Sequence, residues 1–324
     1  MIDRAVDQPI HNSFFGSSLI SLSQYSISEM TRIFDLADRM ADPKHAPHYS
    51  QILAGRVLAL LFFEPSSRTF GSFSSAAKRL GAQTIEIHDA ASTSTSKGES
   101  LEDTIRVFAC YSDGIIMRHH MPGAALRAAG VISKPLVNAG DGIGEHPTQA
   151  LLDIYTIRKH VKNMDGLTGL IVGDLYNGRT VHSLIKGLSN FKNTIIYMLA
   201  PKGLQLSTEQ QTQFASSGVT IKHITRVEDI PQDCDFWYWT RVQKERFTNM
   251  HEYEEVKNSF ILTPALAKKY AGKNTLFMHP LPRVGEIDEA LDADPRAVYF
   301  EQVQNGLYIR QALLALIWGD AGIT

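Results

Sequence analysis

The segment VLALLFFEPSSRTFGSFSSAAKRL, residues 57–80, joins an apolar run to a helical pattern through a turn rich in hydroxyl groups. Residues 57–63 are uniformly apolar, which is typical of a buried strand. After the turn, Phe70, Phe73 and Ala77 recur at helical spacing and predict a helix. A strand followed directly by a helix is half of a βαβ unit, so this segment predicts an α/β fold with a parallel sheet.

The same alternation of apolar runs and helical patterns continues along the chain. Ser26 and Glu29 have the spacing of a capping box and predict a helix over residues 26–40. Further strands are predicted from the apolar runs at 114–117, 170–173, 194–199, 235–239 and 275–278. The sequence therefore predicts an α/β protein in which each domain is a parallel β-sheet flanked by helices.

A helical pattern at residues 147–161 separates the first of these strands from the later ones. It follows His146 in HPTQALLDIYTI, and proline suits the first turn of a helix. We expect two domains, as suits 324 residues, with residues 1–147 in the first and 148–304 in the second. An apolar helix at 307–318 is expected to return, so that residues from about 305 to 324 join the first domain.

The composition is that of an ordinary globular protein. Lysine and arginine (32) nearly balance aspartate and glutamate (34), so no overall field favours nucleic acid or an anionic membrane. Cys110 and Cys234 are far apart and have no metal-binding spacing, which predicts no metal site and favours a reducing compartment. The opening MIDRAVDQPI lacks the apolar core of a signal peptide, so a cytoplasmic location is expected.

The turn EPSSRT, residues 64–69, has the chemistry of a phosphate site. The start of a helix presents free backbone N–H groups and a positive dipole end, both of which attract phosphate. Ser66, Ser67 and Thr69 add hydroxyl groups, and Arg68 adds a planar fork that matches phosphate oxygens. Because the GxxxxGK[ST] pattern is absent, a nucleoside triphosphate is not implied; a serine-capped helix with a surface arginine is the plainer reading.

The segment FFEPSSRTF resembles the carbamoyl-phosphate loop of the aspartate/ornithine carbamoyltransferase family, and further motifs follow in that family's order. They are MRHH (117–120), NAGDGIGEHPTQALLD (138–153), VGDLYNGRTVHSL (172–184), TRVQKERF (240–247) and HPLPRVGEID (279–288). The resemblance covers nearly the whole chain. TRVQKER and HPLPR look like the aspartate branch, because the ornithine branch usually reads HCLP at the latter place.

The resemblance implies a site that binds carbamoyl phosphate without a cofactor or metal. In this site Ser66, Ser67, Arg68 and Thr69 hold the phosphate, and Arg118 reaches both the phosphate and the carbonyl group. His146, with Thr69, polarises the carbonyl oxygen. Gln149 binds the carbamoyl NH₂ group. Such donors act on the charge that develops on the oxygen during the reaction.

Lys97 follows a run of serine and threonine residues in a predicted polar loop. In the family this pattern marks a loop that reaches into a neighbouring subunit's site, so the resemblance implies a homotrimer with shared active sites. Lys97 would then contact both substrates, and Thr93 is the expected accompanying hydroxyl, with Ser92 as the alternative. A regulatory chain or other pyrimidine enzymes remain possible partners.

The acceptor implied by the resemblance is L-aspartate, a dicarboxylate that two separated guanidinium groups could bind. Arg179 and Arg241 follow predicted strands, and both lie where ligands bind in open α/β sheets. Gln243 is a further substrate contact, and the backbone carbonyls of Pro280 and Leu281 would accept from the incoming amine. Closure of the two domains would bring the reactants together and exclude water.

Three positions differ from the usual aspartate pattern. Phe70 stands where arginine is common, His120 where proline is common and Tyr176 where lysine is common. None removes a residue assigned to chemistry, so activity is expected to survive, with His120 and Tyr176 able to tune affinity or rate. The alternatives are a carbamoyltransferase for ornithine or another amine, and a catalytically silent scaffold or regulatory homologue; a dinucleotide dehydrogenase is disfavoured because VGDLYNGRT lacks GxGxxG.

Overall fold

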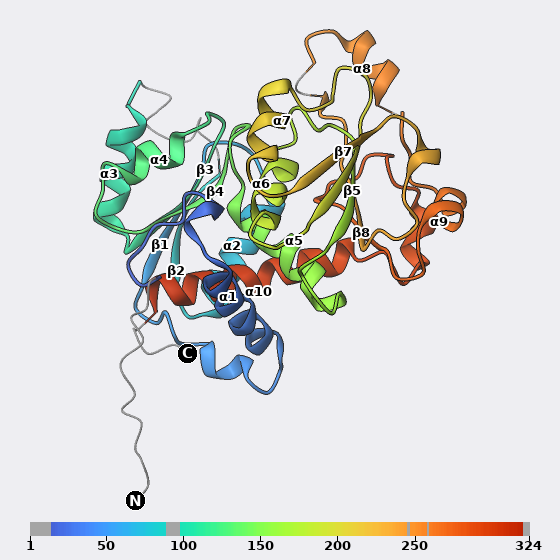
Figure 1. The fold of residues 1–324 in the computed structure, drawn as a ribbon. Helices are drawn as coiled ribbons and strands as arrows, with labels where there is room; N and C mark the ends of the chain where they lie inside the picture. Colours follow the sequence, from blue (N-terminus) through green and yellow to red (C-terminus); the bar gives the residue numbers. More distant parts are fainter. Residues whose placement is uncertain (1–13, 89–97, 245–246, 258, 320–324) are drawn as a thin grey trace, which may run out of the picture.

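A computed structural model describes residues 14–88, 98–244, 247–257 and 259–319 of the chain. It contains two parallel sheets, one built from the first half of the sequence and one from the second (Figure 1). Helices flank both sheets, which confirms the predicted α/β class. Among the described residues, no helix is long and apolar enough to cross a membrane.

The first sheet has the strand order β2-β1-β3-β4, and all its neighbours are parallel. Its inner strands are buried along almost their whole length, as expected for a parallel sheet covered on both faces. The elements of this half are β1 (Val57–Phe62), α2 (Ser67–Arg79), β2 (Gln83–Ile87), α3 (Leu101–Tyr111), β3 (Gly114–His119), α4 (Ala124–Ala129) and β4 (Leu136–Asp141).

The second sheet has the order β7-β6-β5-β8-β9 and is also parallel. Strand β8 (Phe236–Trp239) is fully buried, and β7 (Thr220–Ile224) is a largely exposed edge strand. The other elements are β5 (Thr168–Val172), α6 (Arg179–Leu188), β6 (Ile195–Leu199), α7 (Thr208–Ala215), α8 (Met250–Val256), α9 (Pro264–Tyr270) and β9 (Leu276–Met278). Short 3₁₀ turns are η1 (Leu22–Gln24), η2 (Ala46–Tyr49), η5 (Val227–Asp229) and η7 (Glu289–Ala293).

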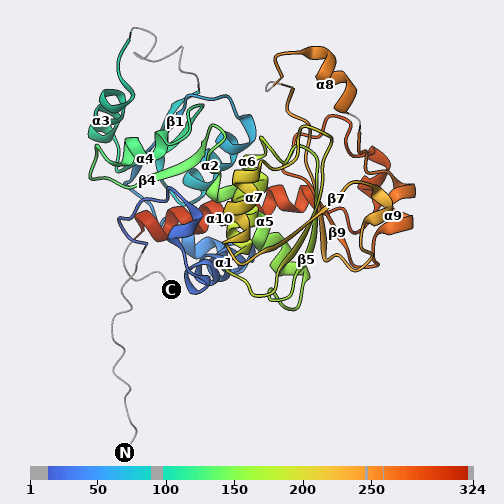
Figure 2. The same ribbon diagram turned by 45° about the horizontal axis from the view of Figure 1, so that its top comes forward.

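Three long helices connect the two halves. Helix α1 (Ile27–Ala41) begins at Ser26, whose capping box with Glu29 is formed as predicted. Helix α5 (Pro147–His160) runs between the sheets, and α10 (Tyr299–Trp318) packs against α1, α2 and α5 (Figures 1 and 2). Helix α10 begins earlier than the predicted residue 307, because buried polar residues interrupt the apolar pattern of its first turns.

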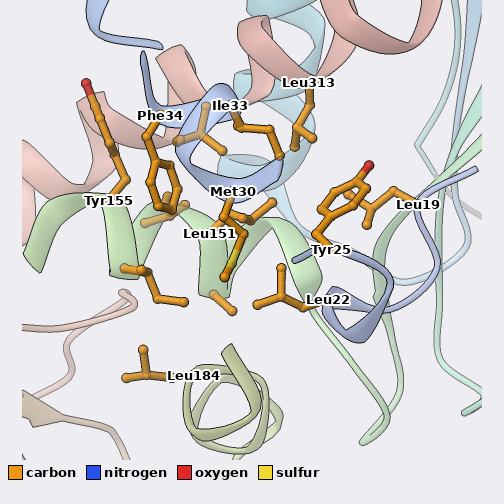
Figure 3. Close-up of a cluster of buried hydrophobic side chains, with 14 of the residues drawn as sticks. Leu19, Leu22, Tyr25, Met30, Ile33, Phe34, Leu151, Tyr155, Leu184 and Leu313 are labelled. Atoms are coloured by element: carbon orange, nitrogen blue, oxygen red, sulfur yellow. The ribbon is translucent and has the colours of Figure 1, made fainter. Parts of the chain in front are cut away.

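The side chains of these connecting helices form one hydrophobic core. Figure 3 shows Met30 and Phe34 of α1 meeting Leu151 and Tyr155 of α5, with Leu184 of α6 below them. The same cluster continues into strands of both sheets. Helix α5 and its first residues are therefore held from both sides of the molecule.

Candidate active site

A cleft lies where the carboxyl ends of strands from both sheets face each other. Residues from the first half approach it after β1, within β3 and at the start of α5, and residues from the second half follow β5, β8 and β9. This edge is where ligands bind in open α/β sheets. The lining residues are Glu64, Pro65, Ser66, Arg68, Thr69, Ser72, Arg118, His146, Gln149, Leu152, Gly178, Arg179, Thr180, Thr240, Arg241, Gln243, His279, Pro280, Leu281, Pro282, Gln302, Val303 and Arg310.

The hydroxyl turn forms one wall of the cleft. Ser66 is the N-cap residue of α2, and its hydroxyl makes no capping hydrogen bond within the described chain. Ser66, Arg68 and Thr69 line the cleft, so that their donors and the start of α2 face the same space. Ser67 also lies in the first turn, but it is exposed and is not among the lining residues.

Arg118 and His146 form the inner part of this wall. Burial, and then the charge of Arg179, lower the pKa of Arg118 to about 10, so it remains a cation at neutral pH. Burial and the charge of Arg118 hold the pKa of His146 well below its usual value, so its imidazole is neutral. The Nδ1 atom of His146 and the Nε atom of Arg118 are buried without a hydrogen-bond partner among the described residues. The hydrogen-bonding capacity of both atoms is therefore unused within the described chain.

Gly140 allows these two side chains to lie close together. Its φ is +115°, and a Cβ atom there would lie 2.9 Å from Nη1 of Arg118 and 3.4 Å from Cδ2 of His146. The backbone N–H of His146 is held in turn by the second half of the chain, because it donates to Oγ of Ser183 on α6 at 3.0 Å. Ser183 thus connects α6 to His146, the residue expected to polarise the carbonyl oxygen of carbamoyl phosphate.

Glu64 is a charged lining residue that the sequence prediction did not assign to the site. Nη2 of Arg118 donates to it at 2.9 Å, and both Nη atoms of Arg179 donate to it at 3.1 Å. Burial would raise the pKa of Glu64, but the hydrogen bonds and charges of the two arginines outweigh burial and lower it. The signal was present in the sequence, because a carboxylate directly before a phosphate turn needs cations to offset it.

The acceptor wall contains Arg179, Arg241 and Gln243. Arg179 opens α6, and it also donates to the carbonyl of Gly142 at 2.6 Å. Nε2 of Gln243 donates to the carbonyl of Asn177 at 3.1 Å. Burial, and then the charge of Arg241, lower the pKa of Arg68. The cleft is therefore strongly cationic on both walls.

The segment after β9 closes the end of the cleft. Pro280 and Leu281 line it, as predicted for the HPLPR motif, and the bond between Leu281 and Pro282 is cis. The backbone N–H of Leu281 donates to Nδ1 of His279, whose Nε2 lies 2.7 Å from a carboxylate oxygen of Glu286. Because Nδ1 accepts, Nε2 carries the proton and donates to Glu286. This pair fixes the segment that presents the Pro280 and Leu281 backbone.

The floor of the cleft was only partly predicted. Gln149 lines it as expected, and its amide donates to Asp153, which is fully buried in α5. Gln302 and Arg310 also line the floor, and no local motif marked them because they lie on α10, distant in sequence. Ser72 lines it as well, from α2, but lies just beyond the turn that the sequence prediction assigned.

Two predicted site residues are not described by the structure, and the three departures do not line the cleft. Lys97 and Thr93 fall outside the described residues. The ring of Phe70 packs on Phe62 and His88, whereas Tyr176 is 49% exposed. His120 stacks on His119 in a separate depression. Within the described ranges, no group of His, Cys, Asp or Glu is placed to hold a metal ion.

Two family domains match the chain in succession. Residues 17–159 match the aspartate/ornithine carbamoyltransferase carbamoyl-P binding domain, and residues 165–317 match the Asp/Orn binding domain of the same family. The aspartate carbamoyltransferase catalytic subunit of Parabacteroides distasonis is 45% identical over 94% of this chain and 98% of its own length. Multifunctional protein pyr1-3 of Dictyostelium discoideum is 46% identical, but the chain spans only 14% of its length.

Solved structures agree with the sequence relatives. Aspartate transcarbamoylase from Trypanosoma cruzi, crystallised with carbamoyl phosphate and aspartate, is 38% identical with a TM-score of 0.88, covering 95% of this chain and 98% of that one. The catalytic subunit of aspartate transcarbamoylase from M. Jannaschii is 41% identical with a TM-score of 0.84, covering 92% and 97%. With both family domains matched in order and along almost its whole length, the chain belongs to the aspartate/ornithine carbamoyltransferase family.

Proposed function

We propose that this chain transfers the carbamoyl group of carbamoyl phosphate to the amino group of L-aspartate, giving N-carbamoyl-L-aspartate and phosphate in pyrimidine biosynthesis. One observation carries the proposal: the hydroxyl turn and Arg118 line the same cleft as Arg179 and Arg241. This arrangement places a phosphate site opposite a carboxylate site. The T. cruzi enzyme, which was crystallised with both substrates, supports the same assignment.

The donor is bound by the first wall of the cleft. Ser66, Arg68 and Thr69 hold its phosphate, with the start of α2 adding backbone N–H groups. Arg118 bridges the phosphate and the carbonyl oxygen, and His146 donates to that oxygen as a neutral imidazole. Donors fixed in a water-poor site stabilise the oxyanion of the tetrahedral intermediate. Gln149 accepts from the carbamoyl NH₂ group.

The acceptor is bound by the second wall. Arg179 and Arg241 each take one carboxylate of aspartate, and Gln243 adds a further contact. The aspartate nitrogen attacks the carbonyl carbon, the C–N bond forms, and the C–O bond to phosphate breaks. The departing phosphate takes the proton that the amine loses, and the Pro280 and Leu281 carbonyls orient that amine.

The charges of the cleft favour aspartate over ornithine. Glu64 is the one carboxylate among the described lining residues, and Arg118 and Arg179 already engage it. A cationic ornithine side chain would therefore meet arginines without a free carboxylate. A dicarboxylate acceptor instead offsets the positive charge of both walls.

The remaining assignments follow from the same proposal. Residues 1–147, with about 305–324, form the carbamoyl-phosphate domain, and residues 148–304 form the aspartate domain. Ser67 is included as a phosphate contact, and Lys97 and Thr93 complete the site of a neighbouring subunit in a homotrimer. We place the protein in the cytoplasm, with a regulatory chain or other pyrimidine enzymes as candidate partners.

The proposal is tested by measuring carbamoyl-aspartate formation with wild type, Arg68→Ala and Arg241→Ala. Arg68→Ala should abolish turnover, because it removes the phosphate fork, whereas Arg241→Ala should chiefly raise the KM for aspartate. Arg226→Ala is the matched control, since this arginine is exposed and pairs with Asp229 outside the cleft. Equal turnover in all four proteins, or faster product formation with ornithine than with aspartate, would contradict the proposal.

A further inference from the structure

Asp153 lies directly beneath the residue that receives the donor's NH₂ group. We propose that Asp153 is a positioning residue: it fixes which end of the Gln149 amide faces the cleft and thereby makes the site selective for a carbamoyl group over an acyl group. This inference rests on the proposed function. It assigns a role to a buried carboxylate that touches neither substrate.

The Asp153 carboxylate is surrounded by hydrogen-bond donors from three elements. Its Oδ1 atom accepts from Nε2 of Gln149 on α5 at 3.0 Å and from Nε2 of Gln302 on α10 at 2.5 Å. Its Oδ2 atom accepts from the hydroxyl of Tyr238 on β8 at 2.8 Å. The side chain is fully buried, so water does not compete for these positions.

The direction of the Gln302 hydrogen bond follows from the backbone. Oε1 of Gln302 accepts from the backbone N–H of His279 at 3.1 Å, and a backbone N–H can only donate. The other end of the Gln302 amide is therefore its NH₂ group, which faces Asp153. Oδ1 of Asp153 consequently acts as an acceptor, whatever the protonation state of the Oδ2 oxygen beside Tyr238.

An obligatory acceptor at Oδ1 also fixes the amide of Gln149. The NH₂ group of Gln149 donates to this oxygen, so its carbonyl oxygen is the end left for the cleft that Gln149 lines. The NH₂ group of carbamoyl phosphate is a donor and matches this oxygen, whereas the methyl group of acetyl phosphate does not. If the Gln149 amide were reversed, its NH₂ group would face the NH₂ group of the ligand, and neither could accept a hydrogen bond from the other.

The experiment compares carbamoyl phosphate with acetyl phosphate, which carries a CH₃ group where carbamoyl phosphate carries NH₂. We would measure the KM for carbamoyl phosphate and the Ki of acetyl phosphate, with aspartate saturating, for wild type, Asp153→Leu and Asp153→Asn. Asp153→Leu should lower the ratio of Ki to KM by about tenfold, the value of one well-placed hydrogen bond. Asp153→Asn should keep the wild-type ratio, because its amide oxygen can still accept from both glutamines.

Thr156→Val is the matched control. Thr156 lies further along α5 and accepts from Asn305 of α10 at 2.9 Å, so this buried polar pair joins the same helices without lining the cleft. Thr156→Val should lower the stability of the fold without changing the ratio of the Ki of acetyl phosphate to the KM for carbamoyl phosphate, called here the donor ratio. Should Asp153→Leu fail to fold, Asp153→Leu combined with Arg310→Met removes both charges of the floor and is measured against Arg310→Met alone.

The outcomes separate this inference from the proposed function. Wild-type protein that does not carbamoylate aspartate would overturn the function and the inference together. An active wild type whose donor ratio survives Asp153→Leu would overturn the inference alone. A ratio that falls equally in Asp153→Asn or in Thr156→Val would also overturn it, because charge or general packing would then set the selectivity.

Discussion

Glu64 lines the cleft, in the part that we call the rim, whereas Asp153 is buried beneath the floor, and the two carboxylates are held in opposite ways. Glu64, at the rim, pairs with Arg118 and Arg179, which lower its pKa against the effect of burial. Asp153, under the floor, accepts from uncharged amide and hydroxyl groups, and burial raises its pKa to about 7 despite these hydrogen bonds. One carboxylate is stabilised by full charges and the other mainly by dipoles.

The difference follows from where each carboxylate lies. Glu64 comes from the first half of the chain and Arg179 from the second, so their ion pair joins the two halves at the cleft. Asp153 sits inside the packed helix α5, where amide and hydroxyl dipoles are fixed in place. The charged groups at the rim are suited to binding and releasing charged substrates, whereas the buried hydrogen bonds of Asp153 are suited to holding the Gln149 amide in one orientation.

The largest expected effect comes from the two buried arginines associated with these carboxylates. Both Arg118 and Arg310 have a pKa of about 10, lowered by burial, but Arg118 pairs with Glu64 and Arg310 donates to the hydroxyl of Ser72. Arg118→Met should lower kcat by roughly 10²–10³-fold, as the loss of an oxyanion donor does. The loss of kcat in Arg310→Met should be smaller than that in Arg118→Met by about tenfold or more, because Arg310 is not assigned a hydrogen-bonding role in the reaction.

Steady-state kinetics with both substrates saturating measures this difference. Circular dichroism of each variant controls for folding, since removal of one buried charge can leave another unpaired. Equal losses of kcat in the two variants would show that the arginines of the floor and of the rim contribute equally to catalysis, which would contradict this prediction.

Much of the fold could be predicted from the sequence because its inner strands are continuous apolar runs. Strands β1, β3, β5, β6, β8 and β9 lie where such runs predicted them. Three strands were missed for physical reasons. Strand β2 and the edge strand β7 are partly exposed and carry polar residues, and β4 contains the buried polar residues Asn138 and Asp141.

The site was predictable where its residues lie in contiguous motifs. Arg118, His146 and Arg179 line the cleft as expected, whereas Ser67 does not. Gln302 and Arg310 could not be recognised, because they reach the floor from a helix distant in sequence. Tertiary packing alone brings such residues to the cleft.

A smaller effect is expected when the rim carboxylate alone is changed. Glu64→Gln removes the charge that holds both Nη atoms of Arg179, so this arginine is less well oriented for the acceptor. Loss of a charge-assisted contact corresponds to roughly tenfold to hundredfold in affinity, and we expect the KM for aspartate to rise by that order. The KM for carbamoyl phosphate should change less, since Arg118 keeps its contact with the Ala139 carbonyl. Initial rates at varied aspartate measure the effect, and a larger change for carbamoyl phosphate would contradict it.

The smallest expected effect is a difference in the pH dependence of stability, and here the two carboxylates should have opposite signs. The pKa of Glu64 is lowered in the folded chain, so its contribution is present above its unfolded pKa and is lost as pH falls. The pKa of Asp153 is raised from 3.8 to about 7, so the folded state binds the extra proton, and stability is lost as pH rises between these values.

Urea unfolding of wild type, Glu64→Gln and Asp153→Asn at several pH values measures both slopes. Between pH 3.8 and about 7, Asp153→Asn should gain stability relative to wild type by up to about 1.4 kcal/mol per pH unit, the value for one proton. Glu64→Gln should instead lose stability relative to wild type as pH rises from acid, because only the wild type gains the ion pairs. If the two differences change with the same sign, charge and dipole stabilisation are not separated between the rim and the floor.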